Sequence, residues 1–111
     1  MAFITKNNLQ RQIQYFQECG LLDEYHNITP DGAIVYSAKK YIENGNLKPP
    51  TDRNFRNIGE FNRILKVLIR HELAYEDTLS GRPGLVNATE YYIELLDRSE
   101  LDGNRIISVN V

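Results

Sequence analysis

Residues 59–84, GEFNRILKVLIRHELAYEDTLSGRPG, decide the fold, because they join an amphipathic helix to a cluster of turn-forming residues. From residue 60 to residue 73, apolar residues recur at helical spacing, and three cations follow one another on another face. The apolar set is Phe61, Ile64, Leu65 and Leu68, and the cations are Arg63, Lys66 and Arg70. Residues 73–77 are strand-like, and the glycines and proline of residues 80–84 predict a turn after them. We therefore expect a helix followed directly by a hairpin.

Two further helices are predicted upstream of this one. Thr29 can cap a helix in which Pro30 occupies the first turn, and that helix ends at the turn formers of residues 44–46. Its buried positions are expected to be Ile34, Val35, Ala38, Tyr41 and Ile42. The Pro-Pro-Thr-Asp of residues 49–52 predicts the start of a short helix over 53–58, with Gly59 as the turn that follows.

The two ends of the chain add smaller elements. Residues 6–19 predict a helix with Leu9, Ile13 and Phe16 on one face, and the apolar run at residues 21–25 is either a strand or an extension of that helix. Residues 85–96 favour a strand because of Tyr91, Tyr92, Ile93 and Leu95, although part of the stretch also fits a helix. A loop over 98–104 and a last strand over 106–111 complete the prediction.

Taken together, residues 31–96 resemble the winged helix-turn-helix family. The similar segments are the helix end at Tyr41–Gly45, the entry Pro49–Phe55 into the next helix, Gly59 at a tight turn, the helix end at 64–73, and Ser80–Gly84 followed by Glu90–Ile93 as a wing. The resemblance implies an α+β, mostly helical fold with a three-helix core, a β-wing and, here, an additional N-terminal helix. We expect one domain over residues 1–111, with an N-terminal extension at 1–28, the winged-helix core at 29–98 and a C-terminal extension at 99–111.

The same resemblance implies duplex DNA as the partner, read by residues 59–73 and by the wing at 80–84, as in a transcription regulator. The residues expected to contact DNA are Arg53, Arg56, Asn57, Asn62, Arg63, Lys66, Arg70 and Arg82, and those expected at phosphates are Lys39, Lys40 and Lys48. The expected DNA contacts lie in the basic middle of the chain. Residues 39–82 carry nine cations and six anions, whereas both ends of the chain are acidic.

Composition places the chain among soluble globular proteins. Its 111 residues include one cysteine and no long apolar run, so we expect a cytoplasmic protein without a disulfide or a membrane span. Neither a metal-ligand pattern nor a phosphate-binding glycine motif is present, so we expect no metal, no cofactor and no enzymatic activity.

Two alternatives stay open. The net charge of −2, with Glu76 and Asp77 just before the wing, also fits a protein-interaction module on the same scaffold, such as a viral or mobile-element accessory protein. The basic helix face also fits a merely solvated surface, and Gly81–Gly84 a simple turn. Because proteins of this family commonly form homodimers, we expect a homodimer, with the apolar face of the N-terminal helix as the candidate interface.

Overall fold

A computed structural model of the chain describes residues 9–76, 79 and 81–110. The helices are α1 (Leu9–Glu18), α2 (Pro30–Ser37), the 3-10 helix η1 (Ala38–Tyr41), α3 (Phe55–Arg70) and α4 (Asn87–Asp97). The strands are β1 (Ile42–Glu43), β2 (Asn46–Leu47), β3 (Ala74–Glu76), β4 (Pro83–Leu85), β5 (Ser99–Asp102) and β6 (Arg105–Val109). About half of the described residues are helical, so the α+β class is confirmed.

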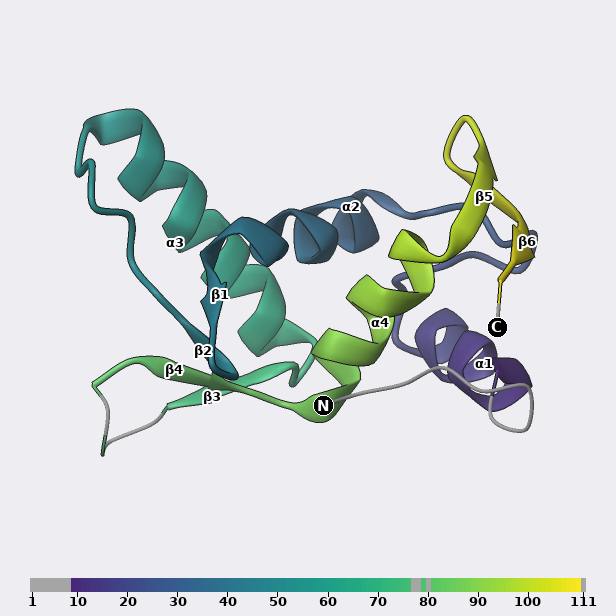
Figure 1. Cartoon of the computed structure of the whole chain (residues 1–111), viewed down its shortest axis with the longest axis horizontal. Coiled ribbons are helices and arrows are strands. Elements are labelled where there is room, and N and C mark those ends of the chain that lie inside the picture. Colours follow the sequence, from purple (N-terminus) through teal and green to yellow (C-terminus); the bar gives the residue numbers. More distant parts are fainter. Residues whose placement is uncertain (1–8, 77–78, 80, 111) are drawn as a thin grey trace.

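The helices pack around α2, which contacts both α3 and α4, while α1 contacts α4 (Figure 1). An antiparallel sheet of four short strands, in the order β1-β2-β4-β3, lies beside α3. A separate antiparallel hairpin of β5 and β6 follows α4. None of the helices within the described part of the chain combines the length and the apolar character needed to cross a membrane.

The start of α2 follows the prediction. The Thr29 hydroxyl accepts a hydrogen bond from the Gly32 amide at 3.0 Å, and Pro30 occupies the first turn. The helix ends earlier than expected, because Ile42 belongs to β1 and pairs with Leu47. Asn44 and Gly45 both have positive φ values, 51° and 77°, and together form the two-residue turn of this hairpin. Asn44-Gly45 therefore connects β1 to β2, and the prediction that it ends the helix is wrong, because the helical segment stops at Tyr41.

Helix α3 is continuous, so the predicted short helix at 53–58 and the turn at Gly59 are wrong. Asn54 caps the helix by accepting a hydrogen bond from the Asn57 amide at 2.8 Å, and Gly59 lies in the second turn. A glycine inside a helix costs about 1 kcal/mol relative to alanine, which the burial of Phe61 and Ile64 in the next turns outweighs. The two helices that the winged-helix prediction places on either side of Gly59 are therefore one helix.

The stretch after β4 also differs from the prediction, because residues 87–97 form α4 and not a strand. Thr89, Tyr92, Ile93 and Leu96 are buried at spacings of three and four residues, so helical periodicity prevails over the strand preference of the aromatic residues. The predicted loop over 98–104 holds β5 and its turn, while the last strand is confirmed as β6.

The core reaches into the N-terminal helix. Phe16 is fully buried and Ile13 nearly so, and the Phe16 ring meets the Tyr92 ring edge-on, with centroids 5.0 Å apart. The apolar face of α1 therefore packs within its own chain, and its assignment as a dimer interface is wrong. The apolar run after α1 is neither helix nor regular strand, because Leu22 makes only an isolated bridge to Ile28.

Candidate functional site

A groove between α2 and α3 brings together four of the residues expected to contact DNA. It has a volume of about 440 Å³ and is lined by Asp31, Ile34, Gly59, Asn62, Arg63, Lys66, Val67 and Arg70. The α3 residues of this set lie three and four positions apart, so they share one face of the helix. Arg63, Lys66 and Arg70 were predicted to share one face of the helix, and they line this groove together with Asn62.

The groove is basic. Its one carboxylate is that of Asp31, in the first turn of α2, which accepts from Arg70 Nη1 at 3.3 Å and lies 2.8 Å from His71 Nε2. Arg63 and Lys66 are exposed, and neither has a carboxylate within ion-pair distance among residues 9–76, 79 and 81–110. Two cations of the groove are thus available to an anionic partner.

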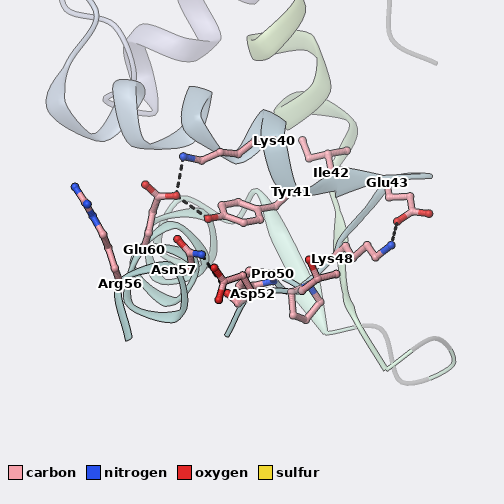
Figure 2. A pocket seen from close by; sticks show the side chains of 12 residues that line it. Lys40, Tyr41, Ile42, Glu43, Lys48, Pro50, Asp52, Arg56, Asn57 and Glu60 are labelled. Atoms are coloured by element: carbon pink, nitrogen blue, oxygen red, sulfur yellow. Dashed lines mark hydrogen bonds and ion pairs between the residues drawn. The ribbon is translucent and has the colours of Figure 1, made fainter. Parts of the chain in front are cut away.

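A larger hollow of about 880 Å³ lies between η1, β1, residues 48–52 and the first turns of α3 (Figure 2). It holds four further predicted contacts, Lys40, Lys48, Arg56 and Asn57, together with the carboxylates of Glu43, Asp52 and Glu60. Lys40 Nζ lies 2.7 Å from Glu60 Oε1, and Lys48 Nζ lies 3.1 Å from Glu43 Oε2. Two of the three cations of this hollow, Lys40 and Lys48, are therefore already paired with carboxylates of the chain.

Glu60 is the centre of this second site. The Tyr41 hydroxyl donates to Glu60 Oε1 at 2.6 Å, and Figure 2 shows Lys40 and Tyr41 converging on that carboxylate. Hydrogen bonds from Lys40 and Tyr41, with the charge of Arg56 nearby, lower the pKa of Glu60 below its ordinary value. The same hydrogen bond to Glu60 raises the pKa of Tyr41 to about 12. The contacts tie η1 to α3 and describe a structural site.

The remaining predicted cations are dispersed. Lys39 Nζ pairs with Asp97 of α4 at 2.8 Å, where Asp97 also accepts from the Tyr36 hydroxyl. Arg82, expected at the tip of a wing, lies 3.9 Å from Glu43 of β1. The β3–β4 hairpin does follow α3 directly, but exposed Glu43 and Glu76 lie in its sheet, and Asp77 lies outside the described residues. These two predicted cations therefore lie away from the α2–α3 groove, beside carboxylates of other elements.

Arg53 belongs to a third, smaller hollow that the sequence analysis did not recognise. Its lining is Arg53, Phe55, Ile58, Gly59 and Asn62, and its volume is about 240 Å³. Phe55 is 99% exposed, and Ile69, two turns beyond Asn62 on the same side of α3, is 56% exposed. The sequence shows Phe55, Ile58 and Ile69 as apolar residues of this helix, but their position outside the core set of Phe61, Ile64, Leu65 and Leu68 was not recognised.

Metal chemistry has no visible support in the described ranges, where His, Cys, Asp and Glu form no group of three that could hold an ion. Comparison of the chain with known protein families, curated proteins and solved structures gives no match. The α2–α3 groove, with the cations along α3, is therefore the candidate functional site.

Proposed function

We propose that this protein is a small DNA-binding regulator that contacts duplex DNA through one face of α3. The face consists of Arg56, Arg63, Lys66 and Arg70, here called the α3 stripe, with Asn62 at its edge. The observation that carries the proposal is the α2–α3 groove, in which Arg63 and Lys66 are exposed and have no carboxylate partner among the described residues, whereas Lys39, Lys40 and Lys48 are paired elsewhere.

The dimensions of the stripe support this assignment. A helix of 16 residues is about 24 Å long, and the major groove of B-DNA is wide enough to admit one helix. Arginine side chains can hydrogen-bond guanine through two donors, and asparagine can read adenine in the same way. We therefore expect Arg63, Lys66 and Arg70 to contact phosphates or guanines, and Asn62 to hydrogen-bond a base edge.

In the winged-helix family the hairpin also contacts DNA, whereas the proposal assigns no DNA contact to the β3–β4 hairpin. Arg82 lies beside Glu43, and Glu76 is exposed on β3, so the β3–β4 hairpin presents mixed charge. Like charges facing phosphates oppose binding. We therefore attribute the favourable contacts with DNA to α3 and none of them to the hairpin.

The test is selection from a random pool of short duplexes at roughly 50 and 200 mM salt. Salt-sensitive binding with enrichment of one sequence supports the proposal, because phosphate contacts release counterions and base contacts select sequence. Arg63→Ala is expected to weaken specific binding by about 1–3 kcal/mol. Lys39→Ala is the control, since Lys39 is held by Asp97. An absence of binding at the lower salt would refute the proposal.

A protein-interaction module is the second candidate, and the acidic residues of the sheet favour it. Glu43 pairs with both Lys48 and Arg82, which breaks the basic surface between α3 and the hairpin. A protein partner would bind without the steep salt dependence of a DNA complex. Failure of the DNA selection would direct the search to such a partner.

A further inference from the structure

The cations that line the α2–α3 groove have different surroundings. Arg70 Nη1 donates to Asp31 Oδ2 at 3.3 Å, and His71 Nε2 lies 2.8 Å from the same oxygen. Arg63 and Lys66 line the same groove but have no carboxylate within ion-pair distance in the part of the chain that the structure describes. Arg70 is therefore the groove cation that a carboxylate holds from the side.

The Asp31 carboxylate is itself held in place. Asp31 lies in the first turn of α2, and the next residue, Gly32, is buried so closely against the Leu21 carbonyl that a Cβ would overlap it. The His71 side chain is only 14% exposed and contacts the carboxylate from the end of α3. Since both its backbone and its carboxylate are restrained, Asp31 restricts the directions that the Arg70 guanidinium can take.

Asp31 also changes what Arg70 is suited to bind. A phosphate placed on the Arg70 guanidinium would come close to the Asp31 carboxylate, and like charges repel. A neutral acceptor meets no such repulsion. The contact with Asp31 engages Nη1, which leaves the edge formed by Nε and Nη2 for two parallel hydrogen bonds. In the major groove, guanine presents two neutral acceptors side by side, O6 and N7.

We propose that Arg70 reads a guanine of the DNA site and that Asp31 is the residue that positions Arg70 for it. This assignment rests on the proposed function and names the base that the C-terminal end of the α3 stripe selects. Lys66, one turn before Arg70, contacts a phosphate as a point charge. The negative charge of Asp31 has a second effect, because it weakens the attraction of the groove for DNA of any sequence. Asp31 thus lowers general affinity and raises sequence discrimination.

The first test replaces single guanines in the duplex that the selection enriches. 7-Deazaguanine keeps the base pair and lacks the N7 acceptor, so at one guanine it is expected to weaken binding of the natural protein about three- to tenfold. Arg70→Ala is expected to bind the two duplexes equally. Binding in which no guanine N7 matters overturns the assignment and leaves the proposed function standing. An absence of DNA binding overturns both.

Asp31→Asn distinguishes positioning of Arg70 from general support of the fold. The variant is expected to lose most of the preference for guanine over 7-deazaguanine, while its affinity for an unrelated duplex rises because a negative charge has left the groove. Asp52→Asn is the matched control, with the same change of charge at an exposed residue before the first turn of α3, at the opposite end from Arg70. It should keep the full preference. Circular dichroism checks that both variants are folded. A full preference in Asp31→Asn, or an equal loss of affinity for all duplexes, overturns the positioning role.

Lys66→Ala tests the division between the two cations. It is expected to weaken binding to the enriched and the unrelated duplex by the same factor, and to leave the preference for guanine over 7-deazaguanine unchanged. A preference that is lost in Lys66→Ala and kept in Arg70→Ala would assign the guanine to Lys66 and overturn the proposal.

Discussion

The rings of Phe16 and Tyr92 meet edge-on with their centroids 5.0 Å apart, and this contact joins α1 to α4 across 76 positions of the sequence. The Tyr92 hydroxyl donates to the Leu21 carbonyl at 3.2 Å, so the same side chain also holds the segment after α1. The N-terminal helix is thereby an integral part of the core.

Phe16→Ala is expected to lower the free energy of unfolding by about 3–5 kcal/mol, because it removes a fully buried ring and leaves a cavity against Tyr92. Tyr25→Ala, at a side chain that is 66% exposed, serves as the control and should change stability little. Urea unfolding monitored by circular dichroism measures both. Equal effects of the two variants would mean that α1 is not part of the cooperative core.

Two glycine substitutions are expected to act in opposite directions. Gly59→Ala should stabilise the protein by about 0.5–1 kcal/mol, because Gly59 lies inside α3 with open space around it. Gly32→Ala should destabilise it, because a Cβ at Gly32 would overlap the Leu21 carbonyl and the Tyr92 hydroxyl. Thermal unfolding of the two variants gives the comparison. A loss of stability in Gly59→Ala would favour a turn at that position.

The pairing of Glu60 predicts a dependence of stability on pH. Because hydrogen bonds from Lys40 and Tyr41 lower the pKa of Glu60, its contribution to stability is present above its unfolded-state pKa and is lost as the pH falls through the lower folded-state pKa. Glu60→Gln should therefore be less stable than the natural protein at pH 7, and the difference should shrink at about pH 3. Urea titrations at the two pH values measure it. A difference that is constant with pH would show that ionisation of Glu60 does not matter.

Local signals in the sequence predicted several features correctly. Thr29 and Pro30 fix the start of α2 through contacts within one turn, and the spacing of Arg63, Lys66 and Arg70 places them on one face because helical geometry is local. The Asn-Gly of residues 44–45 was read as a helix end, although its two positive φ values also suit a hairpin turn.

Long-range contacts explain what the sequence did not predict. Gly59 is a turn former by local preference, but burial on either side of it keeps α3 continuous. The carboxylate partners of Lys39, Lys40 and Arg82 lie 58, 20 and 39 positions away in the sequence, so only the folded chain shows which cations are neutralised. In the same way, only the folded chain shows that Phe55 and Ile69 of α3 stay exposed while Phe61, Ile64 and Leu68 are buried.

The most direct test of the proposed function is the salt dependence of DNA affinity in two triple variants of equal charge. One replaces Arg63, Lys66 and Arg70 by alanine, and the other replaces Lys39, Lys40 and Lys48, which are paired with acids. Each lost phosphate contact should lower the slope of log affinity against log salt by about 0.9. The account predicts a slope reduced by about 2–3 in the first variant and nearly unchanged in the second. Equal changes in both variants would contradict it, because net charge and not the α3 stripe would then govern binding.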